Sequence, residues 1–155
     1  MNKNVNKNDT RMIDVSAKKE SDREAVAAAC VKMSAETLAT VKKKQVPKGD
    51  VFIVAQVAGM MAAKQAPGLL PLCHPLLLAS TAIELSLSPR RRCIEITATV
   101  KGKGRTGFEM EALTAVSVAA LTVYDMCKML DKGMVITDIR LLKKTGGQSG
   151  TYTAK

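Results

Sequence analysis

The sequence predicts a single α+β domain in which an antiparallel sheet carries its helices on one face. Two segments with strict alternation predict a hairpin in the middle of the chain, and a long apolar run after them predicts a buried helix. The 155 residues suit one domain, and a hydrophobic content of 46% is enough for a proper core. We expect a disordered basic tail at residues 1–11, one folded domain at 12–150 and a flexible C-terminus at 151–155.

The first elements are a strand and two helices. Residues 23–33, "REAVAAACVKM", are assigned to a strand, although their alanines also favour a helix. Ser34 then has N-cap character and predicts a helix in "AETLATVKKK", and Asp50 caps a second helical stretch at 51–64. One face of that stretch is expected to be apolar, through Val51, Val54, Ala55, Ala58 and Met61.

The hairpin comes next. "AIELSLS" places Ile83, Leu85 and Leu87 on one side of a strand, and after the turn "PRRR" the segment "CIEITATV" does the same with Ile94, Ile96, Ala98 and Val100. The apolar helix follows from about Thr114, and "MVITDIRLLKK" supplies a last strand. The resulting order, β-α-β-β-α-β, is the ferredoxin-like arrangement.

The apolar run "LTAVSVAALTVYDMCKML", residues 113–130, is long enough to cross a membrane. Asp125 and Lys128 lie well inside it, and the chain has neither a second apolar span nor a signal peptide. We therefore expect a soluble, cytoplasmic protein that does not bind membranes.

Two sides of this helix are apolar. Val116, Ala120, Val123, Cys127 and Leu130 can face the sheet, whereas Val118, Leu121 and Met129 point elsewhere. The second side needs a cover, and in so short a chain this predicts another subunit, with the chain's own loops as the alternative.

Charge and cysteine spacing restrict the function. The formal charge of +10 favours an anionic partner, such as nucleic acid, a phosphorylated metabolite or an acidic surface. The four cysteines form no CxxC pair and the chain has one histidine, so we expect no metal site and reduced, mostly buried thiols.

Three local motifs have more than one interpretation. Asp125 and Lys128 are i,i+3 neighbours in an apolar helix, which predicts partial burial and favours a functional site over an ordinary ion pair. "GKGRTG", residues 102–107, matches GxGxxG, but "FEME" should separate it from the helix, so a glycine-rich bulge or turn is expected. "KKTGGQSG" is either a phosphate cradle or a flexible tail.

Five segments together resemble the MoaC family, the cyclic pyranopterin monophosphate synthases of molybdenum-cofactor biosynthesis: "KGDVF", "PLCHPLLL", "GFEMEALTA", "AALTVYDMCK" and "LLKKTGGQSG". The resemblance covers residues 12–150. It implies a catalytic domain and a lyase that rearranges a cyclised dihydroguanosine triphosphate to cyclic pyranopterin monophosphate and releases pyrophosphate. It also implies a hexamer built as a trimer of dimers, and in this interpretation the rearrangement needs no cofactor, although a divalent ion could accompany the triphosphate.

The resemblance implies roles for particular residues. Asp125 is then the catalytic acid-base residue, with Lys128 and Lys48 as its partners. Substrate contacts are implied at Leu72, Cys73, His74, Met110 and Glu111. Glu109 is a further candidate for proton transfer, and Lys64 and Lys144 are candidates for holding phosphate.

Structural interpretations of these residues stay open. His74 could be a structural histidine, Lys48 a loop charge, Cys73 a packing residue, and Glu109 and Glu111 the solvated side of a strand. A ferredoxin-like RNA-binding module is the alternative function, although "CIEITATV" contains no aromatic residue on which bases could stack. A non-catalytic oligomer would leave the charged pair in the helix without a purpose.

Axial distance predicts that the site is shared between chains. Glu111 is expected before the apolar helix, while Asp125 lies at least eleven residues inside it. At about 1.5 Å per residue the two are roughly 16 Å or more apart, too far to hold the same reacting atoms.

Overall fold

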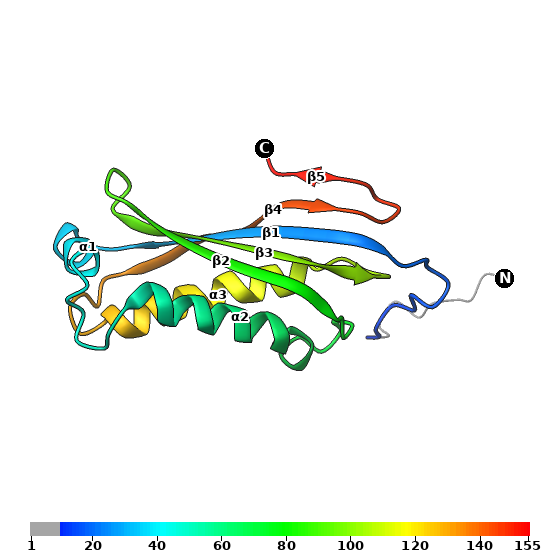
Figure 1. Ribbon diagram of the computed structural model, residues 1–155, viewed down its shortest axis with the longest axis horizontal. Coiled ribbons are helices and arrows are strands. Elements are labelled where there is room, and N and C mark those ends of the chain that lie inside the picture. Colours follow the sequence, from blue (N-terminus) through cyan, green and yellow to red (C-terminus); the bar gives the residue numbers. More distant parts are fainter. Residues whose placement is uncertain (1–9) are drawn as a thin grey trace.

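A computed structural model describes residues 10–155 (Figure 1). The elements follow the chain as β1 (Ser21–Lys32), α1 (Ala35–Lys42), α2 (Val51–Leu69), β2 (Leu78–Ser88), β3 (Cys93–Gly104), α3 (Glu109–Cys127), β4 (Val135–Thr145) and β5 (Tyr152–Thr153). Most of the tail that we expected to be disordered, residues 1–9, lies outside the described part of the chain.

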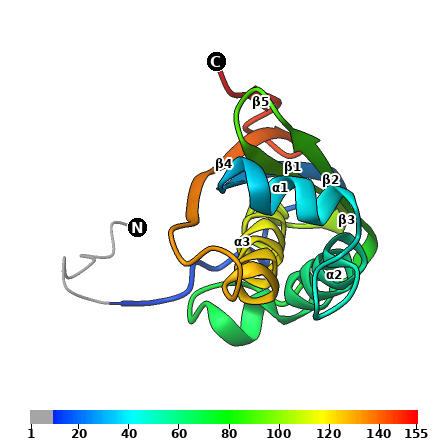
Figure 2. The ribbon, with the colours of Figure 1, turned by 90° about the vertical axis from the view of Figure 1, so that its left-hand side faces the viewer.

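The five strands form one antiparallel sheet in the order β2-β3-β1-β4-β5. Both long helices lie on the same face of it: α3 packs on β1, β3 and β4, and α2 packs on β2 and α3 (Figures 1 and 2). The predicted α+β class is confirmed. The ferredoxin-like detail fits only roughly, because the first connection holds two helices and because the terminal residues 151–155 contain β5.

The early elements form as predicted, for reasons of capping and packing. Ser34 Oγ accepts a hydrogen bond from Thr37 N at 3.1 Å, and Asp50 Oδ1 accepts one from Phe52 N at 3.0 Å, so each helix begins at its cap. The alanine-rich segment is a strand in spite of its helix propensity. Its buried alanines, Ala25, Ala27 and Ala29, let α3 approach the sheet closely, and this packing outweighs propensity.

The predicted apolar face of α2 is partly wrong. Val51 and Ala55 are buried, but Val54 and Met61 are 42% and 62% exposed. The buried side consists of small residues, because α2 runs tightly between β2 and α3. At Gly59 an added Cβ would lie 3.1 Å from Ile83 Cγ1 and 3.2 Å from Ala115 O. The larger apolar side chains are therefore left outside.

Helix α3 begins earlier than predicted, at Glu109 instead of about Thr114. Val116, Ala120, Val123 and Cys127 are buried as expected. Leu130 is not: it lies beyond the end of the helix and is 45% exposed. Leu121 and Met129 point outward, as predicted, and are 57% and 74% exposed. This leaves an uncovered apolar side on the helix.

Length and composition alone would allow α3 to cross a membrane, the only such helix in the described residues. Half of its most apolar stretch is buried inside the domain. Its contacts with three strands and with α2 make it the core helix of this fold.

The segment "GKGRTG" forms the last three residues of β3 and the short link that follows, and only Phe108 separates it from Glu109 at the start of α3, so the expected separation by "FEME" is wrong. Its first glycine is a packing requirement. A Cβ at Gly102 would overlap the ring of the fully buried Phe108 and would lie 2.8 Å from Leu77 O. The glycine lets the Phe108 ring close the core at the start of α3.

We expect Gly102→Ala to lower the free energy of unfolding by roughly 1–3 kcal/mol, the usual effect of overpacking a core. Urea denaturation followed by circular dichroism measures it. Gly68→Ala is the matched control, because Gly68 lies inside α2 and an added Cβ would meet nothing closer than Gln65 Oε1 at 3.7 Å. Equal effects of the two substitutions would contradict the packing argument.

Candidate active site

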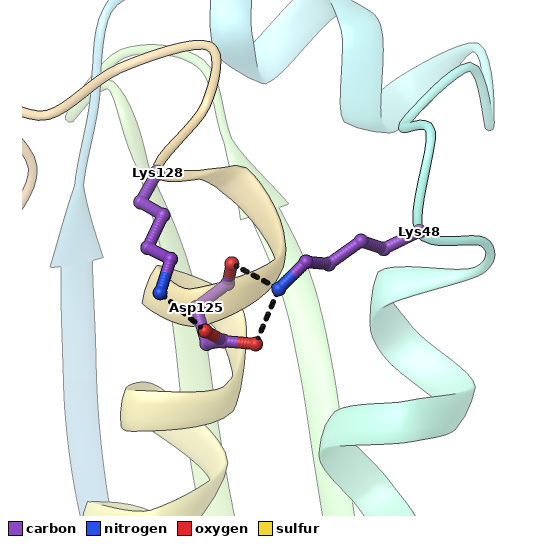
Figure 3. Close-up of polar contacts among 3 residues, drawn as sticks. All are labelled: Lys48, Asp125 and Lys128. Atoms are coloured by element: carbon purple, nitrogen blue, oxygen red, sulfur yellow. Dashed lines mark hydrogen bonds and ion pairs between the residues drawn. The ribbon is translucent and has the colours of Figure 1, made fainter.

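Three predicted site residues meet at the end of α3 (Figure 3). Lys48 Nζ lies 2.7 Å from Asp125 Oδ2 and also donates to the Asp125 backbone oxygen at 3.1 Å. Lys128 Nζ lies 2.8 Å from Asp125 Oδ1. One carboxylate is thus held between two ammonium groups, and Lys48 is more than a loop charge.

Local sequence places each of these side chains. Pro47 opens a tight turn, closed by a 3.0 Å hydrogen bond from Gly49 N to Val46 O, which holds Lys48 opposite the end of α3. Lys128 is the C-cap of α3, one turn beyond Asp125. The last carbonyls of a helix lack internal partners, and Lys48 satisfies that of Asp125. The start of α2 is thereby tied to the end of α3.

The electrostatics of this group separate the roles of its members. The two lysine hydrogen bonds lower the pKa of Asp125 to about 2, and the carboxylate raises the pKa of Lys128. At neutral pH Asp125 is therefore an ionised hydrogen-bond acceptor and Lys128 a charged hydrogen-bond donor. The predicted partial burial is wrong, since the Asp125 side chain is 55% exposed. Val123 and Cys127 take the buried side of α3, so Asp125 points outward.

A second group of predicted residues surrounds the start of α3. Glu109 and Glu111 lie in its first turn, not on a strand, and Cys73 and His74 follow the end of α2. Cys73 Sγ lies 3.8 Å from Glu111 Oε1 and 3.7 Å from the His74 carbonyl oxygen. Cys73 therefore makes polar contacts and is more than a packing residue.

Glu111 is a buried acid with unused hydrogen-bonding capacity. It is 1% exposed, and within the described part of the chain its Oε2 has no hydrogen-bond partner. Burial raises the pKa of Glu111, and it also raises the pKa of the Cys73 thiol beside it. A carboxyl group with a raised pKa takes up a proton more readily than an ordinary glutamate does.

We expect Glu111→Gln to reveal this through the pH dependence of stability. Because the pKa is raised on folding, the contribution of Glu111 to stability is complete below the unfolded-state pKa and is lost as pH rises through the folded-state pKa. The amide cannot ionise. Relative to the unmodified protein, the variant should therefore gain free energy of unfolding as pH rises from the ordinary range of a glutamate pKa through the raised folded-state pKa of Glu111. Chemical denaturation at several pH values measures the difference; a constant difference would contradict it.

His74 is held by the segment that precedes β1. Its Nε2 lies 2.8 Å from Ile13 O, and since a carbonyl oxygen only accepts, Nε2 carries the proton. Among residues 10–155 no partner is bonded to Nδ1, which is then free to accept a hydrogen bond from a ligand.

A cavity of about 700 Å³ opens beside this second group. Glu109 and Lys144 line it, with Lys144 Nζ 3.4 Å from Glu109 Oε1 and 2.8 Å from Ser149 Oγ. Sequence reasoning missed its other cations, Lys18, Lys19, Arg23 and Arg105. They come from segments far apart in the sequence, and no spacing rule connects them.

Arg23 joins the two glycine-rich motifs at this cavity. Its Nε donates to Gly104 O at 2.9 Å and its Nη2 to Arg105 O at 3.2 Å. A Cβ at Gly147, where φ is +76°, would overlap the same guanidinium group. "KKTGGQSG" is therefore an ordered wall of the cavity whose glycine makes room for Arg23.

Not all of the predicted site residues come together in the structure. Leu72 and Met110 are near the second group but 47% and 40% exposed, and Lys64 projects from the exposed side of α2 without a polar contact to described residues. The two groups lie at opposite ends of α3. Asp125 is fourteen residues beyond Glu111 in that helix, which separates them by about 21 Å.

Among residues 10–155, no three His, Cys, Asp or Glu side chains are placed to hold a metal ion.

Comparison with known proteins gives a consistent result. The model of the MoaC family matches residues 12–147. The chain is 60% identical over 143 residues to a cyclic pyranopterin monophosphate synthase of Rhodospirillum rubrum, covering 92% of this chain and 86% of the relative. It is 55% identical over 142 residues to the protein of that name from Peptoclostridium acidaminophilum, covering 92% and 89% of the two chains. The corresponding Desulfitobacterium hafniense protein is 57% identical, with 92% and 86% covered.

Proposed function

The chain belongs to the MoaC family, and on that premise we propose that it rearranges a cyclised dihydroguanosine triphosphate to cyclic pyranopterin monophosphate with release of pyrophosphate. The observation that carries this proposal is the carboxylate of Asp125 between Lys48 and Lys128. The rearrangement opens a purine ring, builds a pterin and closes a cyclic phosphate. Each step moves a proton, so it needs a base and an acid side by side.

The residues divide this work according to their charge. Asp125 is ionised and Lys128 is charged at neutral pH, so the first can accept a proton and the second can donate one, although the ion pair between them weakens both the base and the acid. Lys48 orients the carboxylate. At the other end of α3, Glu111, Cys73 and His74 offer hydrogen bonds to the heterocycle, with Leu72 and Met110 beside them. Glu111 Oε2 and His74 Nδ1 still lack partners in the described chain, as groups that await a ligand would.

The cavity beside Glu109 fits the triphosphate. Five cationic side chains line it, from Lys18, Lys19, Arg23, Arg105 and Lys144. Arginine forks and lysine ammonium groups are the usual protein partners of phosphate. Its volume of about 700 Å³ is within the range of small-molecule sites. These cations hold pyrophosphate until it is released.

The site is shared between two chains. Met110, Leu121 and Asp125 lie on one exposed side of α3, because eleven residues make just over three helical turns and four residues make about one. Val118 is midway between Glu111 and Asp125. A twofold axis perpendicular to α3 that passes outside the helix, beside this residue, would place Asp125 of each chain against the first turn of its partner's α3. The separation of about 21 Å within one chain is then removed.

An exposed apolar side of α2 supports this arrangement. Ile53, Val57 and Met61 follow each other at helical spacing and are 59%, 50% and 62% exposed, a stripe that a second helical layer would cover. Lys64 continues this stripe and reaches the partner's site. Three such dimers form a hexamer, and the enzyme works in the cytoplasm.

The direct test is turnover. Purified protein is incubated with enzymatically prepared cyclised dihydroguanosine triphosphate, while pyrophosphate release and a product oxidisable to a fluorescent pterin are followed. Stoichiometric formation of both is expected. Well-folded protein that releases neither would overturn the proposal. RNA binding is the alternative function, and the relatives do not support it; it would require tight binding of single-stranded RNA at physiological salt.

A further inference from the structure

Two runs of basic residues meet at one end of the molecule. Residues 42–44, three lysines, lie at the end of α1, and residues 90–92, three arginines, form the turn between β2 and β3 (Figure 1). One cavity is lined by Lys42 from the first run and by Arg92 from the second. The fold therefore brings together two charged segments that lie almost fifty residues apart in the sequence.

Each run uses one member to hold the fold. Lys44 pairs with Asp50 at 3.0 Å, and Arg91 pairs with Glu95 at 2.7 Å and with Asp138 at 3.2 Å. The other four cations are exposed and have no ion-pair partner among residues 10–155: Lys42, Lys43, Arg90 and Arg92. Because no described carboxylate neutralises them, this end of the molecule attracts anionic partners.

Arg92 occupies a backbone position that favours glycine. Its φ is +50°, in the left-handed region that a side chain destabilises. Its amide nitrogen donates to Pro89 O at 3.2 Å, and its carbonyl oxygen accepts from Met33 N at 2.9 Å, which ties the turn to the residue before the Ser34 cap. Its side chain makes no hydrogen bond or ion pair within residues 10–155. The guanidinium group is therefore held in a pre-formed turn and is available to a partner.

The cavity between these cations is apolar, and we call it the α1 cavity. It has a volume of about 240 Å³ and is lined by Ala35, Leu38, Ala39, Leu87 and Pro89, besides the two cations. The two alanines lie one turn apart on α1 and are exposed, so they leave room for an incoming side chain. The volume is below the range of about 300–1,000 Å³ that is usual for small-molecule sites, and it suits a single apolar anchor of a protein partner.

We infer that this surface binds an acidic segment of another protein, through one large apolar side chain, such as leucine, with carboxylates on either side of it. The apolar side chain fills the α1 cavity. The carboxylates contact Lys42, Arg92 and their unpaired neighbours at the rim, which sets the orientation of the segment. A second copy of this chain is a poor partner, because its formal charge of +10 opposes a cationic surface.

Two other classes of partner fit this surface less well. Membrane surfaces take up protruding apolar side chains, and residues 35–42 and 87–92 contain no exposed large hydrophobic residue. Single-stranded RNA is held by stacking on aromatic side chains, and the residues that line the α1 cavity include none. The inference goes beyond the proposed reaction and requires no step of it.

Peptide binding tests the inference. The probe is a short fluorescent peptide of aspartate and glutamate around a central leucine, and the reference peptide has serine in place of the leucine. Fluorescence anisotropy with the full chain at about 50 mM salt measures both affinities. We expect the leucine peptide to bind with a dissociation constant below about 100 μM, and at least about tenfold more tightly than the serine peptide.

Two variants remove the two features separately. Ala39→Leu fills the cavity with a good helix former, so it should weaken the leucine peptide at least about tenfold and leave the serine peptide within about twofold. Arg92→Gly removes a rim charge and relieves the left-handed position. It should weaken both peptides at least about threefold without lowering the free energy of unfolding. Lys103→Gln, at the other end of β3 and without an ion pair in the described chain, is the matched control and should change neither affinity by more than about twofold.

Equal binding of the two peptides would show attraction by net charge alone and would overturn the inference, as would an affinity for the leucine peptide that Ala39→Leu leaves unchanged. Single-stranded RNA and phosphatidylserine vesicles are tested in the same way. Binding of either that both groove variants weaken, without leucine-dependent peptide binding, would assign the surface to that partner and overturn the inference. No arm measures turnover, so an inactive protein would refute the proposed function and leave this result standing.

Discussion

Replacing Asp125 by Asn is expected to lower turnover by at least about a hundredfold, the usual scale for losing an acid-base group, while the protein stays folded, oligomeric and able to bind its substrate. The amide keeps the shape of the carboxylate, and its one oxygen can still accept a hydrogen bond from Lys48 or from Lys128, whereas its NH2 group cannot accept the other. It cannot take up a proton. Single-turnover kinetics with the cyclised triphosphate measure the loss, and substrate binding by calorimetry shows that the site is otherwise intact.

The control is an aspartate of the same kind in another place. Asp138 lies 3.2 Å from Arg91 Nη2, is 46% exposed and has a positive φ of 56°, a conformation that asparagine tolerates. Asp138→Asn should leave turnover unchanged. Lys128→Met, which keeps the stem and deletes the charge, should resemble Asp125→Asn. If Asp125→Asn unfolds early yet keeps near-normal turnover per folded molecule, the pair serves only to hold the helix.

Mixing two inactive variants should restore activity. Asp125→Ala and Glu111→Ala damage opposite ends of α3. In a hybrid dimer one shared site receives the intact Asp125 of one chain and the intact Glu111 of the other, while the second site has neither. Random pairing makes half of the dimers hybrids, so about a quarter of the unmodified activity is expected. Co-expression with two affinity tags isolates the hybrids for assay.

The matched control for mixing uses two variants from the same end of the helix. Asp125→Ala with Lys48→Ala leaves every site with one damaged member of the same group, so hybrids should stay inactive. Restoration of activity in both mixtures would mean that hybrids regain activity without a site shared between opposite ends of α3. No restoration in the first mixture would show that each chain holds a complete site.

The sequence predicted the elements that depend on short-range patterns. Alternation located β2 and β3, and Ser34 and Asp50 located the starts of α1 and α2 as caps. Sequence patterns gave wrong predictions where tertiary packing determines which residues are buried. The buried side of α2 follows small residues such as Gly59 and leaves Met61 outside, so counting apolar residues identified the buried face only in part. The fifth strand has two residues and depends on its partner, Lys143 and Lys144 in β4.

The site could be predicted only in part, for a related reason. Asp125 and Lys128 are neighbours on one helix, so their pairing follows from spacing, whereas the third member, Lys48, arrives from a turn far away in the sequence. The resemblance to a family supplied it. Arg23, which lines the cavity proposed for the triphosphate, begins a segment that the sequence assigned to a strand, and no pattern marked it as a site residue. Only the fold brings it beneath Gly147 and beside Gly104.

A crystal structure of the Asp125→Asn assembly with the cyclised triphosphate bound would test the shared site most directly. The measurement is which chain each contact to one substrate molecule comes from. We expect Glu111 and His74 of one chain on the heterocycle, and Lys48, Lys128 and the position-125 amide of the partner chain beside the reacting atoms. A substrate held by all of these residues from a single chain would contradict the account.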